Sequence, residues 1–166
     1  AVAILIGLWV YDELSFNKQF ENHNSIAKVT LNYTLNGEVR TGRYMSLPMG
    51  PALKNSYADD FKYVIKSTFT REHALAFGEK VITQPGNFME SDAPHMLTFK
   101  MLQGTRDGLK DPYSIMLSAS LARIFFGNEN PLDRVLKVDG KVDSKVTGVY
   151  EDMPHNSEFA ELAFIA

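Results

Sequence analysis

Histidine is the residue type in this 166-residue sequence with the widest chemical use, in metal binding and in proton transfer. No two histidines lie within four residues of each other, and each lies in a segment that we interpret as polar loop or surface. The short ligand spacing that identifies most metal sites is therefore missing, and we predict no metal site. The histidines are His23, His73, His95 and His155.

Carboxylate pairs and serines are the next candidates for catalysis. Asp59-Asp60 and Glu151-Asp152 are adjacent acids in a chain with 20 acidic residues, where such pairs are usually solvated faces or helix ends. Ser118 and Ser120 carry the hydroxyl of a nucleophile, but the sequence indicates no base beside them, and Ser118 is better interpreted as a helix cap. We predict that the protein is not an enzyme.

Whole motifs and composition lead to the same prediction. The sequence contains no phosphate-binding loop, dinucleotide fingerprint, zinc-protease pair or nucleophile elbow. Cysteine is absent, which excludes disulfides, thiolate metal sites and cysteine nucleophiles. The formal net charge of −3, without a cluster of Lys and Arg, gives no reason to expect a nucleic-acid partner. We therefore predict no catalytic residues, no cofactor-binding residues and no bound cofactor.

The first ten residues, Ala1 to Val10, carry no charge. A membrane-spanning helix needs about 20 apolar residues, so this segment is too short to cross a bilayer alone. Trp9 and Tyr11 lie where the segment becomes polar, which is typical of a membrane interface. We interpret residues 1–22 as one helix, the outer end of a transmembrane helix that continues as a stalk. The alternative is an amphipathic or buried helix that begins a soluble domain.

A hairpin is the clearest feature of the next segment. Val29 to Leu35 alternates apolar and polar residues, Asn36-Gly37 is typical of a type I′ turn, and Glu38 to Ser46 returns. A helix is expected from Pro48 to about Tyr57, and a strand from Phe61 to Phe69.

Turn residues divide the rest of the chain. Pro85-Gly86 is interpreted as a turn and a subdomain junction, and residues 70–83 stay ambiguous apart from a short strand candidate at 81–83. Beyond it, the pattern predicts strands at 113–117, 135–138 and 142–150. A helix is expected at 119–126, with Ser118 as its N-cap and Gly127 as its C-terminal stop.

Several of these segments resemble the MacB-like periplasmic core domain. The resemblance covers nearly the whole chain, and its most specific part is residues 111–159, where short motifs occur in one order. Those motifs are Ser114 to Gly127, Asn130-Pro131-Leu132, Leu136 to Val138, Val146 to Val149 and Glu151 to Phe159. The residues outside this part that fit are Tyr11-Asp12, Phe16, Phe20, Asn22, Ile26 to Val29, and Leu53-Lys54 with the segment through Phe61. Ala27, Asp133 and the segment Tyr57 to Asp60 depart from the family pattern.

The resemblance implies an α+β fold with a porter-like α/β sandwich layer, an inserted small β-rich subdomain called sabre-like, and a stalk helix before them. Mapped onto this chain, the end of the transmembrane helix and stalk is 1–22, and the first porter-like part is 23–83. The sabre-like subdomain is 84–154, joined near 83–86 and 152–157. Residues 155–166 form a return strand to the porter-like part, which is expected to be incomplete.

The resemblance also implies a non-catalytic role. Such a domain would couple ATP-driven transmembrane motion of an ABC transporter permease to a substrate or partner outside the membrane. Its expected partners are a cytoplasmic ABC ATPase, a second permease copy and a protein of the periplasm or outer membrane. The expected location is the extracytoplasmic side of the inner membrane. The alternative is a membrane-tethered sensor, which would have one deep, polar-lined pocket for a small ligand.

Overall fold

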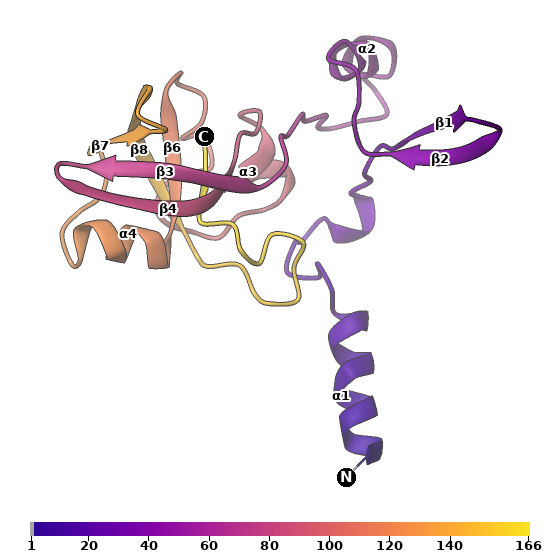
Figure 1. The fold of residues 1–166 in the computed structure, drawn as a ribbon, viewed down its shortest axis with the longest axis horizontal. Helices are drawn as coiled ribbons and strands as arrows, with labels where there is room; N and C mark the ends of the chain where they lie inside the picture. Colours follow the sequence, from indigo (N-terminus) through magenta and orange to yellow (C-terminus); the bar gives the residue numbers. More distant parts are fainter. Residues whose placement is uncertain (1) are drawn as a thin grey trace.

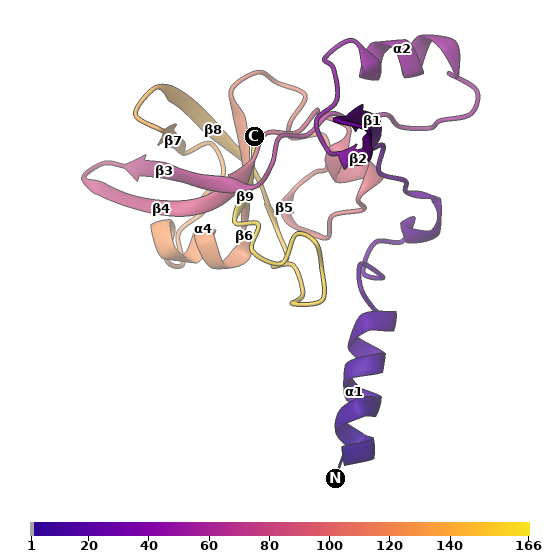
Figure 2. The same cartoon turned by 45° about the vertical axis from the view of Figure 1, so that its right-hand side comes forward.

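The computed structural model describes residues 2–166 and has the predicted α+β composition. Its largest element is a seven-stranded sheet with the strand order β5-β8-β6-β9-β4-β3-β7 (Figures 1 and 2). The strands are β3 (Arg71–Phe77), β4 (Lys80–Asn87), β5 (Met101–Gly104), β6 (Ser114–Ser118), β7 (Val135–Val138), β8 (Val142–Tyr150) and β9 (Phe164–Ile165). The helices are α1 (Val2–Leu14), α2 (Met49–Ser56), α3 (Ala93–Met96) and α4 (Ala119–Phe126), with a short 3-10 turn, η1 (His23–Ser25).

The sheet closes on itself. Strand β7 pairs with β3 on one side and with the first half of β8 on the other. The strands β8, β6, β9, β4, β3 and β7 therefore form a closed ring, the barrel. Strand β5 pairs with the second half of β8. Ring closure leaves few unpaired strand edges, which is how small barrels protect their backbone hydrogen-bonding groups.

Alternate residues of the strands point into this ring and form one core. Side chains two residues apart lie on the same face of a strand, so these residues pack together with those of α4. Helix α4 supplies Leu121, Phe125 and Phe126 to this core. Its predicted limits are confirmed: the Ser118 hydroxyl accepts the Leu121 N–H at 3.3 Å, and Gly127 ends the helix at φ 61°. The strand residues of this core are Leu75, Ile115, Leu117, Leu136, Val138, Val146, Val149 and Phe164.

The opposite face of β6, β8 and β9 carries a second core. Met116, Tyr150 and Ile165 pack there against the segment around α3 and against Phe20, which comes from the N-terminal part of the chain. The Tyr150 hydroxyl donates to the Leu162 carbonyl at 3.1 Å, and its complete burial raises the pKa of this phenol well above the usual value. This second core ties the N-terminal segment to the sheet.

The predicted hairpin is confirmed as β1 (Leu31–Leu35) and β2 (Glu38–Gly42). Asn36 and Gly37 both have positive φ, 53° and 81°, as a type I′ turn requires. With α2, also close to its predicted limits, the hairpin lies apart from the barrel (Figure 1). Between residues 27 and 64, Gly50 is the only buried residue.

Two predicted elements are corrected. The helix expected over 1–22 ends at Leu14, where the Ser15 hydroxyl donates to the Asp12 carbonyl and Asn17 takes φ 60°; Ala1 lies outside the described residues. The strand expected at Phe61 to Phe69 is irregular, with one isolated bridge from Ser67 to Met89. Its aromatic and β-branched composition favours a strand, but no neighbouring strand pairs along its length.

The expected junction at residues 83–86 also differs from the structure. Pro85 and Gly86 lie inside β4, opposite Glu72 and Arg71 of β3, and Gly86 also pairs with Phe164 of β9. Residues 71–83 therefore share their sheet and core with 84–154 and with the last strand. The break in packing lies near residue 64 instead, between the hairpin with α2 and the residues that pack on the second core. The assignment of porter-like and sabre-like names stays a prediction.

Candidate functional site

Helix α1 projects away from the rest of the molecule (Figures 1 and 2). None of its described residues is buried. Its apolar side chains are exposed within this chain, as expected for the outer end of a transmembrane helix: Leu5, Leu8 and Trp9 have exposed fractions of 66%, 61% and 64%. Among residues 2–166, no helix has both the length and the apolar composition needed to cross a membrane. The functional question is how this exposed helix is joined to the barrel.

The joint consists of residues 15–20, after α1, and the loop 155–159, before β9. Asn17 is its centre. The Asn17 N–H donates to the Asn156 carbonyl at 2.9 Å, and its side-chain oxygen accepts the Glu158 N–H at 2.8 Å. The Asn156 amide donates to the Ser15 hydroxyl at 2.8 Å. Asparagine tolerates the left-handed conformation found at Asn17 better than most residues do, which explains its place in this turn.

Two further contacts continue the joint into the second core. The Gln19 amide donates to the Ser157 hydroxyl at 2.6 Å, and Phe20 meets Phe159 edge to face with ring centroids 6.1 Å apart. Phe20 is only 4% exposed. Within the six residues from Ser15 to Phe20, the chain thus passes from an exposed helix to a buried side chain. Backbone and side-chain contacts both connect this segment to the loop 155–159.

An exposed ion pair lies beside the joint. His155 Nε2 is 2.9 Å from a carboxylate oxygen of Asp12, in the last turn of α1. That turn contains no basic residue of its own. Both side chains are largely exposed to solvent, so we assign this pair little stabilising weight.

Asp152 lies three residues before the loop 155–159 and connects this part of the chain to α4. Its carboxylate accepts the Ser120 N–H at 3.0 Å and the Ser120 hydroxyl at 2.7 Å, at the N-terminal end of the helix. Partial burial raises the pKa of Asp152, but the hydrogen bonds from Ser120 outweigh it and hold the pKa below its usual value. A carboxylate at a helix N-terminus is also favoured by the helix dipole. The segment 152–158 is therefore bonded to α4 at its start and to Asn17 at Asn156 and Glu158.

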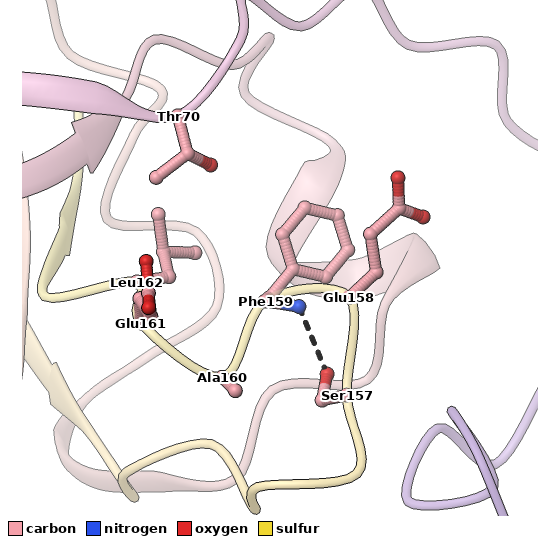
Figure 3. A pocket seen from close by; sticks show the side chains of 7 residues that line it. All are labelled: Thr70, Ser157, Glu158, Phe159, Ala160, Glu161 and Leu162. Atoms are coloured by element: carbon pink, nitrogen blue, oxygen red, sulfur yellow. Dashed lines mark hydrogen bonds between the residues drawn. The ribbon is translucent and has the colours of Figure 1, made fainter. Parts of the chain in front are cut away.

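A small open pocket lies against this loop. It has a volume of about 250 Å³ and is lined by Thr70 and by Ser157 to Leu162 (Figure 3). The loop curves here through the hydrogen bond from the Phe159 N–H to the Ser157 hydroxyl, 3.1 Å long. A second hollow of about 160 Å³ is lined by Gln19-Phe20, Thr98 to Lys100 and Glu151 to Pro154. Ligand pockets are usually larger and more enclosed, so neither matches the pocket that the sensor hypothesis requires.

The residues first considered for chemistry are separated in the structure. His73 bonds to Asp139, His95 to Asp107 and His155 to Asp12, on different parts of the surface. Ser118 and Ser120 both serve the start of α4. No three potential ligands among residues 2–166 come together as a metal-binding group. Their arrangement indicates structural roles.

The residues of the joint were not predicted as functional. Asn156 and Ser157 lie in a motif that supported the family resemblance, but a polar loop carries no periodic pattern that predicts its partner. Asn17 has no flanking turn signal, and it falls where the apolar period indicated continuous helix. Their pairing joins segments about 140 residues apart and becomes evident only in the folded chain.

Comparison with known proteins gives a consistent result. The family model described as "MacB-like periplasmic core domain" matches residues 1–165. A domain assigned to a permease protein of Porphyromonas gingivalis is similar in structure, with a TM-score of 0.65 and 21% identity over 77% of this chain and 54% of the other. The periplasmic region of MacB from Actinobacillus actinomycetemcomitans has a TM-score of 0.59 and 19% identity, over 82% of this chain and 62% of the other.

A third structure is the extracellular domain of the noncanonic ABC-type transporter YknZ from Gram-positive bacteria. It has a TM-score of 0.52 and 18% identity, over 69% of this chain and 58% of the other. The present chain thus covers between 54% and 62% of these three solved chains. A search of curated proteins found no match. The family match extends over all but the last residue, and the fold agrees with it, so this chain belongs to the MacB-like periplasmic core domain family.

Proposed function

We propose that this chain is a non-catalytic extracytoplasmic domain of an ABC transporter permease. In this proposal it passes ATP-driven motion of transmembrane helices to a substrate or partner outside the membrane. The observation that carries the proposal is the joint. Helix α1 has no buried residue, yet the chain directly after it is hydrogen-bonded to the loop 155–159. The family match supports the transporter context.

Helix α1 is proposed to be the outer end of a transmembrane helix. Its apolar side chains cover the whole circumference, as expected for a helix in lipid rather than one lying against a protein core. Trp9 and Tyr11 would lie at the interface with water. Asp12 follows Tyr11 directly. Asp12 and its partner His155 would then be at the level of the lipid headgroups.

The joint would transmit motion because it is short and bonded on both sides. Asn17 lies three residues after the end of α1, so a movement of α1 would reach it directly. From Asn17 the movement would pass to the loop 155–159, and then through Asp152 to α4. The partners in this proposal are a cytoplasmic ABC ATPase, a second copy of the permease, and a protein of the periplasm or outer membrane. The proposed location is the extracytoplasmic side of the inner membrane.

Loosening the joint tests the proposal. In the double variant Asn17→Ala, Asn156→Ala, side-chain hydrogen bonds to Ser15 and Glu158 are lost, at a cost of about 1–2 kcal/mol. Amide exchange at positions 17 and 158 should therefore accelerate by about tenfold, while amides of β6 and β8 keep their protection. Asn130→Ala, which removes a loop hydrogen bond to the Leu132 N–H elsewhere, is the matched control.

The functional measurement uses the intact transporter, reconstituted with its ATPase. Residues 1–166 contain no cysteine, so with any cysteine elsewhere in the transporter replaced, Lys141→Cys gives one spin label at the exposed turn between β7 and β8 in each copy. We expect ATP to change the distance between the two labels in the parent and in Asn130→Ala, and to change it much less in the double variant. An unchanged ATP response in the double variant, with its joint amides exchanging faster, would refute the role of the joint.

A further inference from the structure

The hairpin and α2 form a unit with very little buried surface. The unit comprises residues 28–64, and the chain enters it after Ile26 and leaves it before Ile65. Both isoleucines pack against the second core, so they fix the two crossing points. A two-stranded hairpin is marginally stable alone, and only Gly50 is buried within the unit. Its position relative to the barrel must therefore depend on a few specific contacts.

Glu90 provides the most concentrated of these contacts. This residue follows β4, and its carboxylate lies 3.1 Å from Lys54 Nζ of α2 and 3.2 Å from Lys66 Nζ. The Glu90 N–H also donates to the Lys66 carbonyl at 3.0 Å. The aliphatic part of Lys66 lies against Gly50, so one carboxylate holds both the start and the last turn of α2.

The surroundings favour the charged form of Glu90. Its partial burial raises the pKa, but the hydrogen bonds from Lys54 and Lys66 outweigh this effect and lower the pKa below its usual value. The carboxylate is thus ionised at neutral pH. The lysine side chains are 44% and 45% exposed, so water and salt reach the group. An ion pair of this kind opens and closes readily, unlike a buried apolar contact.

We infer that Glu90 is a releasable electrostatic lock that holds the unit 28–64 in one orientation against the barrel. When the lock opens, the unit turns about its crossing points at residues 26–28 and 65–67, and its ring contacts Tyr44–Phe69 and Tyr63–His95 separate. Lys28 pairs with Glu158 of the joint loop and limits the movement at the first crossing. At the second crossing, the Thr68 N–H bond to the Phe88 carbonyl and the Ser67 bond to Asn87 stay in place. The movement is therefore a rotation of the unit and leaves the barrel intact.

A distance measurement on the 166-residue chain tests the lock. Spin labels at Val39→Cys, on the hairpin, and Lys141→Cys, on the barrel, report the orientation of the unit, because both positions are exposed. Glu90→Gln keeps the size of the side chain and removes its charge. We expect the distance distribution to broaden by about twofold in Glu90→Gln, and by a similar factor in the parent at 1 M salt, where screening is strong beyond about 3 Å.

Glu151→Gln is the matched control, because it removes the ion pair with Lys100 within the barrel body and leaves the unit untouched. Its distribution should equal that of the parent. A distribution in Glu90→Gln as narrow as in the parent, at low and at high salt, would overturn the inference. If Glu90→Gln lowers the melting temperature of the chain, Lys54→Met is a second test, because it breaks only the contact between Glu90 and α2. The experiment needs neither membrane nor ATP, so its outcome is independent of the proposed coupling function.

Discussion

Gly86→Ala is expected to lower the free energy of unfolding by about 3 kcal/mol, at the upper end of the range for overpacked cores. Gly86 pairs directly with Phe164 across β4 and β9. A Cβ at position 86 would overlap the Phe164 ring, which is completely buried. The ring cannot move away, because it is enclosed by the barrel core and flanked by His73, with ring centroids 5.7 Å apart.

Urea or thermal unfolding followed by circular dichroism measures this loss. Gly7→Ala is the control, since a Cβ there meets nothing within 4 Å, and alanine favours helix over glycine. It should leave the melting temperature of the barrel unchanged. In addition, Phe164→Leu should relieve part of the damage when combined with Gly86→Ala, because it removes ring atoms from the point of overlap. A melting temperature of Gly86→Ala equal to the parent would contradict the close packing of β4 against β9.

Removal of residues 1–10 is expected to abolish self-association and binding to lipid vesicles while the barrel keeps its melting temperature. Burial of one large apolar side chain contributes roughly 1.5–3 kcal/mol. Loss of Leu5, Leu8 and Trp9 alone should therefore weaken association with lipid by at least about 100-fold. The barrel should be unaffected, because no described residue of α1 is buried in it.

Light scattering and vesicle sedimentation measure the association, and a thermal melt measures the barrel. The 166-residue variant Leu5→Ser, Leu8→Ser, Trp9→Ser separates loss of apolar surface from loss of chain length, and it should behave like the truncated chain. A large drop in melting temperature on truncation would show that α1 belongs to a soluble core. The interpretation of α1 as a membrane segment would then be wrong.

Local signals made the second half of the chain predictable. Ser118 and Gly127 delimit α4 because a hydroxyl cap and a positive-φ glycine act within one turn of their own helix. Asp139-Gly140 likewise fixes its turn without help from distant residues, and Asn36-Gly37 does the same in the first half of the chain. The family resemblance rested largely on the same part of the sequence.

Contacts between distant segments were not predictable in this way. Strand β3 contains Ala74 and Ala76, which weaken its strand pattern, and it is held by neighbours on both sides. Pro85-Gly86 has the composition of a turn, but the small residue is needed where the Phe164 ring approaches. The joint depends on Asn17 and a loop about 140 residues away, so no local pattern indicates it.

The side of the membrane on which the barrel lies is the central claim, and thiol accessibility in spheroplasts tests it most directly. Residues 1–166 contain no cysteine, so once any cysteine in the rest of the permease has been replaced, single variants of the intact permease can be labelled without background. With a membrane-impermeant maleimide, we predict that Lys141→Cys reacts before lysis and that Leu8→Cys, inside the proposed bilayer segment, stays unlabelled. Labelling of Lys141→Cys only after the membrane is permeabilised would contradict the account.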